Sequence, residues 1–516
     1  MKTVSVLNDV LGPVMRGPSS SHTAGAYHIG RMARDLLGQE PKSARFLFDP
    51  DGSLAEVYRQ QGSDLAFTAG LLGLSITDEA FGRALDLAAE RGLEVSFAIQ
   101  SLSGADHPNA VEIRMVGQDG ERLRVMAKSV GGGAVVFTRV GSWSVHLTGD
   151  AHELLIGLDP GAEGEVRQRL AQAGGFLEDP SLISQGRRQL LRVRRGEAVD
   201  DGLASAVRNL SGVRRVHTVS PVFFVRRGER LFSSAREMIS LANDGGLSLG
   251  EIALAYESDL LGLTGDAVLA EVLRRLEVMQ SSVHRGLEAE LPSMQLLHPS
   301  ARQILEAEGA GQVAAGGMHT RAAARAMAVM HVNGGMGVIC AAPTAGSAGV
   351  IPGVVVTMLE EWELDKRKAG MALLAAGAIG LIVADRATFA AEVAGCQVEI
   401  GAAGAMAAAA VVEVAGGSAQ QAADAAAIAL QNTMGSVCDM VQGIVEIPCH
   451  TRNAAAASSA FICADLVLGG YVNPIPLDET VDAVYATGKM LPRELKCTAL
   501  GGLAATPSGR AMPRLR

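Results

Sequence analysis

The pattern of hydrophobic and polar positions changes twice along the chain and predicts three regions. In residues 1–148, short runs rich in apolar and β-branched residues are typical of strands. These runs are ARFLFD (44–49), EVSFAIQ (94–100), AVEIRMV (110–116) and RLRVMAK (122–128). The segment DEAFGRALDLAAERG (78–92) instead has helical spacing and an acidic first turn. We therefore expect an α+β domain over residues 1–148.

Residues 150–228 follow a βαββαβ order. The segments that carry this order are HELLIGL (152–158), GEVRQRLAQAGG (164–175), RQLLRVRR (188–195), DGLASAVRNLSG (201–212) and VHTVSPVFFVRR (216–227). This spacing suits a small ferredoxin-type sandwich. The turn LDPG (158–161) is similar to the ligand turn of ACT regulatory domains, so we expect an ACT-like domain here. Such a domain could bind a ligand, or serve only as a spacer or dimer contact.

From residue 230 to residue 516 the pattern is helical. Long Ala- and Gly-rich runs at 369–384, 401–416 and 418–431 are apolar on most helix faces. Helices of this kind must be buried against one another. The sequence therefore predicts a multidomain protein that ends in an all-α domain with a dry interior.

Composition narrows the class of protein. Hydrophobic residues make up 48% and charged residues 19% of the chain, which is typical of a globular protein. The net charge of −10 argues against nucleic acid as a partner. The uncharged stretch 369–384 is shorter than the roughly 20 residues of a membrane span, and the opening MKTVSVLNDVLG has no long apolar run of a secretion signal. We expect a cytoplasmic protein without membrane contact.

The six cysteines lie at positions 340, 396, 438, 449, 463 and 497, all in the C-terminal third. A secreted disulfide framework would spread them through a short chain. None of Cys396, Cys438 and Cys449 forms a Cys-x-x-Cys zinc knuckle, but all three lie close to Gly or Pro at expected helix boundaries. Thiolates are the usual ligands of iron–sulfur clusters. On the residues alone, any one of these cysteines could equally be a small buried hydrophobe.

Ordered motifs along nearly the whole chain carry a family resemblance. They are GPSSSHTAG (17–25), HPNAVEIRM (107–115), SVGGGAVVF (129–137), MGVICAAPTAGSAGVIPG (336–353), GCQVEIG (395–401), VCDMVQGIVEIPCHTRN (437–453) and LGGLAATPSGR (500–510). With these motifs the chain resembles the iron–sulfur-dependent L-serine dehydratases, also called L-serine ammonia-lyases. Their β and α parts are here fused in one polypeptide, at residues 1–225 and 230–510.

The resemblance implies a cofactor and a reaction. In the family, the cysteines that match Cys396, Cys438 and Cys449 bind a 4Fe–4S cluster. Three protein ligands leave one iron open, which distinguishes a Lewis-acid centre from a structural one. We expect this iron to activate the 3-hydroxyl of L-serine while a base removes the α-proton, without pyridoxal phosphate. The products would be pyruvate and ammonia.

The resemblance also implies substrate-binding residues, several of which have a structural alternative. GPSSSHTAG is expected to bind the substrate carboxylate, although Ser21 or Thr23 could instead cap a helix. The Gly-rich loop APTAGSAG is expected to donate to that carboxylate or to line the cluster pocket. Arg452 could bind carboxylate or fix its own loop, and Asn109 could contact substrate or hold a loop. The full expected set is Ser19, Ser20, Ser21, Thr23, Asn109, Thr344, Ala345, Gly346, Ser347, Arg452 and Asn453.

Two departures from the family pattern leave questions open. Many members have a histidine where this chain has Gln61, and Gln cannot act as a base. His22 and His107 are therefore the candidates for the catalytic proton transfer, unless the substrate or activity has drifted. Many relatives have Glu where this chain has Cys497. We consider two roles for Cys497: a packing residue, or a reversible fourth ligand of the cluster. Cys340 and Cys463 are expected to be packing residues.

Two other functions compete with an L-serine lyase. One is the same elimination acting on L-threonine or L-cysteine. The other is a sensor in which the ACT-like region binds an amino acid and the cluster reports redox state, although a sensor would not need both the three cysteines and GPSSSHTAG. In each case the partner is a small amino acid, and we expect a homodimer.

Overall fold

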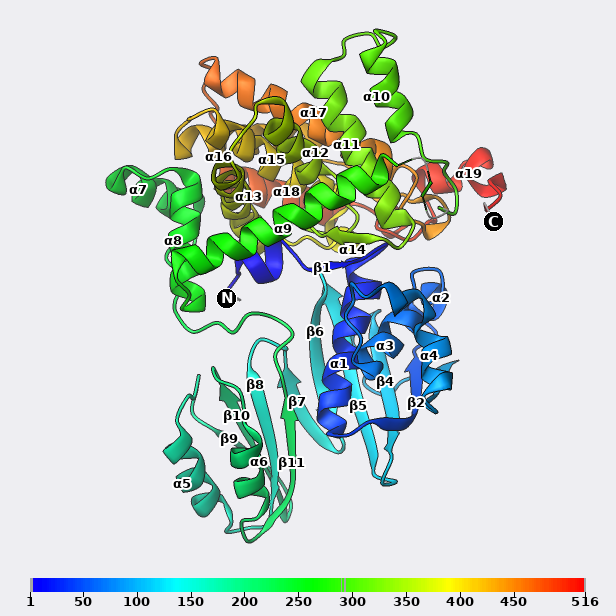
Figure 1. Cartoon of the computed structure of the whole chain (residues 1–516), viewed down its shortest axis with the longest axis vertical. Coiled ribbons are helices and arrows are strands. Elements are labelled where there is room, and N and C mark those ends of the chain that lie inside the picture. Colours follow the sequence, from blue (N-terminus) through cyan, green and yellow to red (C-terminus); the bar gives the residue numbers. More distant parts are fainter. Residues whose placement is uncertain (1–2, 289, 292–293, 515–516) are drawn as a thin grey trace. The chain divides into compact units, whose positions relative to one another are not determined.

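The computed structural model describes residues 3–288, 290–291 and 294–514 (Figure 1). The chain divides into two compact units, one of Met1–Ser20 with Glu229–Arg516 and one of Ser21–Gly228. We call these the helical unit and the sheet unit. Residues 3–20 thus belong to the helical unit, although their sequence pattern predicted that they are part of the α+β domain. The predicted division into three domains stays a prediction.

The sheet unit contains a six-stranded mixed sheet in the order β3-β2-β4-β5-β6-β7. Its strands are β2 (Pro41–Phe48), β3 (Glu94–Ile99), β4 (Ala110–Gly117), β5 (Arg122–Gly131), β6 (Ala134–Val140) and β7 (Trp143–Leu147). The pair β2–β3 is parallel and the other neighbours are antiparallel. The predicted strands correspond to β2–β5. The predicted helix 78–92 is a 3₁₀ turn, Glu79–Arg83, followed by α4 (Ala84–Glu90).

Two helices of the sheet unit, α1 (Gly25–Leu37) and α3 (Ser63–Leu72), pack closely against each other. Glycines make this approach possible. A Cβ on Gly30 would lie 2.4 Å from the Phe67 carbonyl oxygen, and one on Gly70 would lie 2.5 Å from that of Tyr27. The helix pair is therefore fixed by backbone contact, and it positions the segments that precede each helix.

The same unit contains a four-stranded antiparallel sheet in the order β11-β8-β10-β9. Its elements follow as β8 (His152–Leu158), α5 (Glu163–Ala173), β9 (Ser181–Gln185), β10 (Arg188–Arg195), α6 (Asp201–Arg208) and β11 (Val213–Val219). This is the predicted βαββαβ order, although no segment quoted from the sequence covers the strand β9. Apolar residues of β8, β10 and the two helices form its core, including Ile156, Leu170 and Leu191.

The helical unit consists mainly of the helices α7 to α19. They are α7 (Ala235–Gly245), α8 (Leu249–Leu261), α9 (Gly265–Gly286), α10 (Ala301–Gly309), α11 (Gly317–Gly334), α12 (Val350–Glu361), α13 (Lys366–Arg386), α14 (Ala391–Ala394), α15 (Ile400–Val414), α16 (Ala419–Thr433), α17 (Cys449–Leu468), α18 (Leu477–Met490) and α19 (Pro507–Ala511). Helix α15 packs against α12, α13, α16 and α17 (Figure 1). The unit is mostly rather than wholly α-helical, because a short strand β12 (Val338–Cys340) pairs with β1 (Val14–Arg16).

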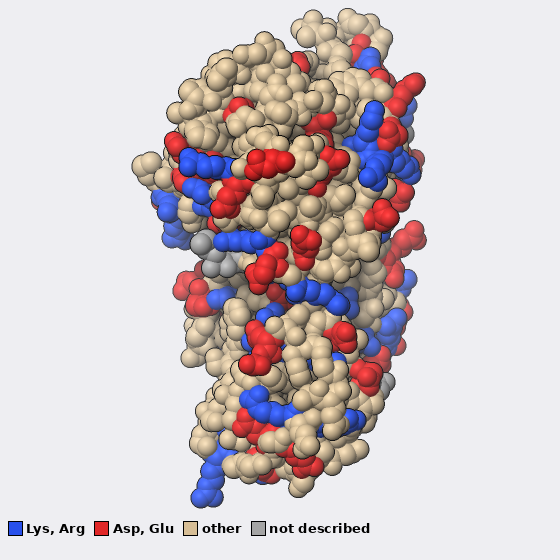
Figure 2. Space-filling view, turned by 90° about the vertical axis from the view of Figure 1, so that its left-hand side faces the viewer, with Lys and Arg blue, Asp and Glu red and all other residues tan. Residues whose placement is uncertain are grey.

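Two segments of this unit are long and apolar enough to cross a membrane, Lys366–Arg386 and Cys396–Val414. Within the structure, 78% and 83% of their apolar windows are buried. These helices are therefore core helices of the unit. On the face shown in Figure 2, acidic and basic side chains are interspersed.

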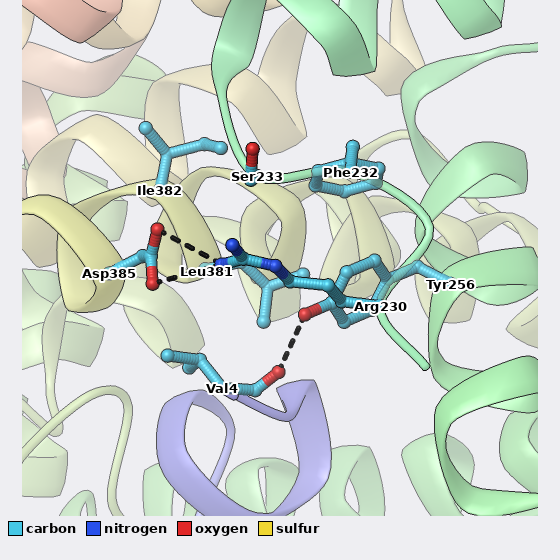
Figure 3. Close-up of a pocket in the computed structure, with 8 residues that line it drawn as sticks. All are labelled: Val4, Arg230, Phe232, Ser233, Tyr256, Leu381, Ile382 and Asp385. Atoms are coloured by element: carbon cyan, nitrogen blue, oxygen red, sulfur yellow. Dashed lines mark hydrogen bonds and ion pairs between the residues drawn. The ribbon is translucent and has the colours of Figure 1, made fainter. Parts of the chain in front are cut away.

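The N-terminal segment is fastened to the helical unit by buried polar contacts. The Glu257 carboxylate accepts hydrogen bonds from Ser5 Oγ at 2.6 Å and from the Val6 and Leu7 amides at 2.8 and 2.9 Å. Figure 3 shows the neighbouring pocket, which is lined mainly by apolar and aromatic side chains together with Arg230, Ser233 and Asp385. In it, the Tyr256 hydroxyl donates to the Val4 carbonyl at 2.8 Å, and Arg230 pairs with Asp385 at 3.4 Å. These contacts fix residues 4–7, the segment that precedes β1.

Candidate active site

The three predicted ligand cysteines are brought together in the helical unit. Cys396 begins a 3₁₀ turn just before α15, Cys438 lies in the segment between α16 and α17, and Cys449 is the first residue of α17. All three are buried. The Cys396 and Cys438 side chains hydrogen-bond, and Cys449 is close enough to Cys396 for their charges to interact. The cysteines that are 42 and 11 positions apart in sequence thus converge on one region.

The other cysteines fall into two groups. Cys340 Sγ lies 3.8 Å from the Leu11 carbonyl and Cys463 Sγ lies 3.8 Å from Ser459 Oγ, in agreement with the packing roles expected for them. Cys497 is different, because its Sγ lies 2.7 Å from Cys438 Sγ. The structure therefore gathers four thiols rather than three.

The donor set can be compared with the implied cofactor. Among the described residues, no three His, Cys, Asp or Glu side chains surround a single metal ion. A polynuclear cluster does not require three side chains around one metal ion, since each thiolate binds a different iron. Buried thiols that converge on one region are the ligand chemistry of iron–sulfur clusters. The residues present thus fit an iron–sulfur cluster.

Arg452 of α17 lies beside these thiols. Its Nη1 donates to the Val437 carbonyl at 2.7 Å and lies 3.5 Å from Cys396 Sγ, and its Nη2 lies 3.0 Å from Asp439 Oδ1. The guanidinium therefore fixes the segment that carries Cys438 and adds positive charge near the thiols. A contact between Arg452 and substrate stays a prediction.

The loop with Thr344 and Ser347 lies against a buried carboxyl group that was not predicted from the sequence. Thr344 Oγ1 donates to Glu399 Oε1 at 2.6 Å and lies 3.0 Å from Ser347 Oγ. A Cβ on Gly346 would lie 2.5 Å from the same Glu399 oxygen, so a larger residue there would displace the Glu399 carboxyl group. Burial raises the pKa of Glu399 to about 7. The signal was present, since Glu399 is the acidic residue of the GCQVEIG motif.

Two asparagines hold the loops of the helical unit together. Asn453 accepts from the Gly349 amide at 3.0 Å and donates to the Gly346 and Cys449 carbonyls, each at 2.8 Å. Asn333, which the sequence analysis did not single out, donates to the carbonyls of Pro18 and Ala345 at 3.3 and 3.2 Å. The backbone that leads into Ser19 and Ser20 therefore lies beside the Thr344 loop.

In the sheet unit, the second half of GPSSSHTAG forms a buried polar turn. His22 Nε2 lies 2.9 Å from Ser53 Oγ and its Nδ1 lies 3.0 Å from Ser21 Oγ. Burial lowers the pKa of His22 to about 4, so the imidazole is neutral at physiological pH. Neither Ser21 nor Thr23 caps α1, whose N-cap is Ala24 without a side-chain bond. Instead, Thr23 Oγ1 donates to the Gln61 carbonyl at 2.8 Å.

His107 and Asn109 lie at the start of β4. His107 Nδ1 accepts a hydrogen bond from the Asn109 amide at 3.1 Å. The pKa of His107 is lowered, mainly by burial and to a smaller extent by the positive charge of Lys128. The side-chain oxygens of Asn109 and Gln61 are buried and have no hydrogen-bond partner among the described residues. Buried oxygens of this kind are expected to bind water or a ligand. The prediction that Asn109 contacts substrate therefore remains open.

A buried thiol cluster beside hydroxyl, carboxyl and guanidinium groups defines a candidate metal-dependent enzyme site. The family model for the serine dehydratase alpha chain matches residues 244–504, and the chain belongs to this family. The expected family resemblance is thus confirmed.

Relatives match both parts of the chain. The probable L-serine dehydratase alpha chain of Bacillus subtilis is 39% identical over 284 residues, which cover 55% of this chain and 95% of that protein. The probable beta chain of the same organism is 39% identical over 156 residues, or 30% of this chain and 69% of that protein. The L-serine dehydratase of Streptomyces coelicolor is 35% identical over 280 residues, or 53% of this chain and 60% of that protein.

Proposed function

We propose that this chain is an L-serine dehydratase that converts L-serine to pyruvate and ammonia. The observation that carries the proposal is the convergence of Cys396, Cys438 and Cys449 in a chain of the serine dehydratase family. Matches to both an alpha and a beta chain support the presence of both parts in one polypeptide. The finer parts of the proposal are a cytoplasmic location, an ACT-like fold for residues 150–228 and a homodimer.

The three thiolates are proposed to hold a 4Fe–4S cluster. When bound, such a cluster supplies a Lewis acid that makes the substrate's 3-hydroxyl a better leaving group. This chemistry replaces the electron sink of pyridoxal phosphate. Arg452 holds the segment that carries Cys438 through the Val437 carbonyl, and Asn453 ties the first turn of α17 to the Gly346 loop.

The polar loops are proposed to bind the amino acid. The hydroxyls of Thr344 and Ser347, with the Ala345 and Gly346 backbone, would donate to its carboxylate. The serines 19–21 and Thr23 would add further donors. His22 and His107 are the candidates for removing the α-proton, and the neutral state of His22 at pH 7 is the state that can accept one.

Anaerobic purification with iron and sulfide quantitation tests the cluster. Cys396→Ala, Cys438→Ala and Cys449→Ala should each lose the cluster, whereas Cys463→Ala should keep it as the matched control. Pyruvate release is then assayed with L-serine, L-threonine and L-cysteine. Cluster-loaded protein that releases no keto acid from any of the three would refute the enzymatic proposal and favour a sensor.

Hydrogen exchange identifies the base. Incubation with L-serine in D₂O should exchange the α-proton, as followed by NMR. His22→Gln and His107→Gln are compared with His284→Gln, whose side chain is 60% exposed and pairs with Glu360. The histidine whose loss abolishes exchange while the cluster is retained is the base, and normal exchange in both variants would exclude both.

A further inference from the structure

Cys497 reaches the predicted ligand set through its backbone. Its amide donates to the Cys438 carbonyl at 2.9 Å, and the Cys438 amide donates to the Leu495 carbonyl at 2.9 Å. Cys438 and Lys496 form a parallel bridge. The 2.7 Å contact between the thiols of Cys438 and Cys497 therefore follows from paired backbones and not from one side-chain rotamer.

The segment that carries Cys497 is held in an uncommon conformation. Cys497 and Ala499 have φ values of 61° and 55°, in the left-handed region that non-glycine residues rarely adopt. Such a residue is strained and persists only where its surroundings impose the conformation. Here the Asp439 carboxylate accepts from the Leu503 amide at 2.8 Å, which fastens the far end of the segment next to Cys438.

The contacts distinguish Cys497 from the cysteines with packing roles. Cys340 and Cys463 lie against a carbonyl and a hydroxyl, whereas Cys497 lies against a thiol of the predicted cluster. The ionisable groups that interact electrostatically with Cys497 include Glu392, Glu399 and Cys396. Cys497 is half-buried, but its thiol has the same donor chemistry as the three expected ligands and lies directly against that of Cys438.

We propose that Cys497 is a fourth thiolate ligand of the cluster, bound to the iron that Cys396, Cys438 and Cys449 leave open. The inference rests on the proposed cluster. The resting enzyme then has thiolates at all four irons, and an amino acid substrate must compete with Cys497 for its iron. Because Cys497 is internal and held by backbone hydrogen bonds, this ligand is set by the fold of residues 495–503.

Mössbauer spectroscopy of the anaerobically reconstituted, ⁵⁷Fe-labelled full-length enzyme tests the ligand without reference to activity. Resting wild-type enzyme should show no separate subspectrum for one iron. Cys497→Ala and Cys497→Ser should keep the cluster and show such a subspectrum, and Cys463→Ala should match the wild type. Loss of one iron to a chelator, followed as a 3Fe–4S EPR signal, should be roughly tenfold or more faster in Cys497→Ala.

Each outcome bears on a different proposal. A distinct iron already present in the resting wild type would overturn the fourth ligand while leaving the three-ligand cluster intact. Spectra of Cys497→Ala that coincide with those of the wild type would do the same. Wild-type enzyme that holds no cluster would overturn both this inference and the cluster in the proposed function. If the variants do not fold, the wild-type spectrum alone decides.

Discussion

Replacing Glu446 by Gln should destabilise the helical unit and loosen the loop that leads to Cys449. Glu446 is 1% exposed, and its carboxylate accepts three backbone hydrogen bonds. They come from the amides of Gln295, Leu296 and Leu297 at 2.7, 2.8 and 2.8 Å. The substitution keeps the size of the side chain, so the effect isolates the loss of one acceptor and of the charge.

The magnitude follows from the three contacts. A glutamine oxygen can replace the carboxylate oxygen that accepts from Leu296 and Leu297, but its amide nitrogen then faces the Gln295 N–H. The orphaned donor costs about 2 kcal/mol, and the other two bonds lose charge assistance worth about 0.5–1 kcal/mol each. The expected loss is about 3–4 kcal/mol, which is a large part of a stability that is typically about 5–15 kcal/mol.

Urea unfolding of the reduced, cluster-free chain, followed by circular dichroism, measures this loss. Glu277→Gln is the matched control, because Glu277 is 62% exposed and pairs with Lys366 at 3.3 Å. We expect it to cost less than about 1 kcal/mol. The main chain of Glu446 also accepts from the His450 amide at 3.0 Å in the first turn of α17, so the cluster-loaded Glu446→Gln enzyme should release iron faster. Equal unfolding midpoints for the two variants would refute the reasoning.

Three further predictions follow from buried groups. Burial lowers the pKa of His28 to about 4, so folding stability should be fully present above pH 6.5 and fall as the pH drops toward 4. Between pH 7.5 and 4.5 His28 should account for about 2.5 kcal/mol of this fall, and urea titrations of His28→Gln should show a pH dependence smaller by that amount. Gly286→Ala should lower the free energy of unfolding by about 3 kcal/mol, because the new Cβ would lie 2.0 Å from the Ala328 carbonyl oxygen. In the control Gly309→Ala the new Cβ meets nothing within 4 Å, so thermal unfolding should show no change or a small stabilisation. Gly346→Ala should displace the Glu399 carboxylate and raise KM for L-serine with the cluster retained, and unchanged kinetics would contradict the role of that loop.

Local patterns predicted the elements whose residues face a core. The strands 94–99 and 110–117 and the long apolar helices appear where their patterns place them. Strand β9 (Ser181–Gln185) was not recognised, because its residues are half-buried or exposed and give no apolar alternation. The pairing of β1 with β12 joins residues more than 300 positions apart, and no local pattern carries that information.

The residues of the candidate site also differ in whether a local motif could predict them. The cysteines were found because they stand in specific motifs, and their convergence agrees with that prediction. Glu399 and Asn333 were missed because their roles depend on contacts with loops far away in sequence. Cys497 could not be separated from a packing cysteine by sequence, since its proximity to Cys438 arises from the bridge between residues 438 and 496.

The abundance of alanine and glycine in the helical unit explains why thiols from separate helices can meet. Helices α15 and α17 pack against each other, and a Cβ on Gly404 would lie only 3.6 Å from that of Ala456. Cys449 begins α17, and Cys396 lies four residues before the start of α15. The amino-terminal ends of two closely packed helices are thus directed to one region, where their partial positive charges favour anionic ligands. Together with the Arg452 guanidinium, they offset the repulsion among thiolates that would otherwise oppose gathering three or four of them in a dry core.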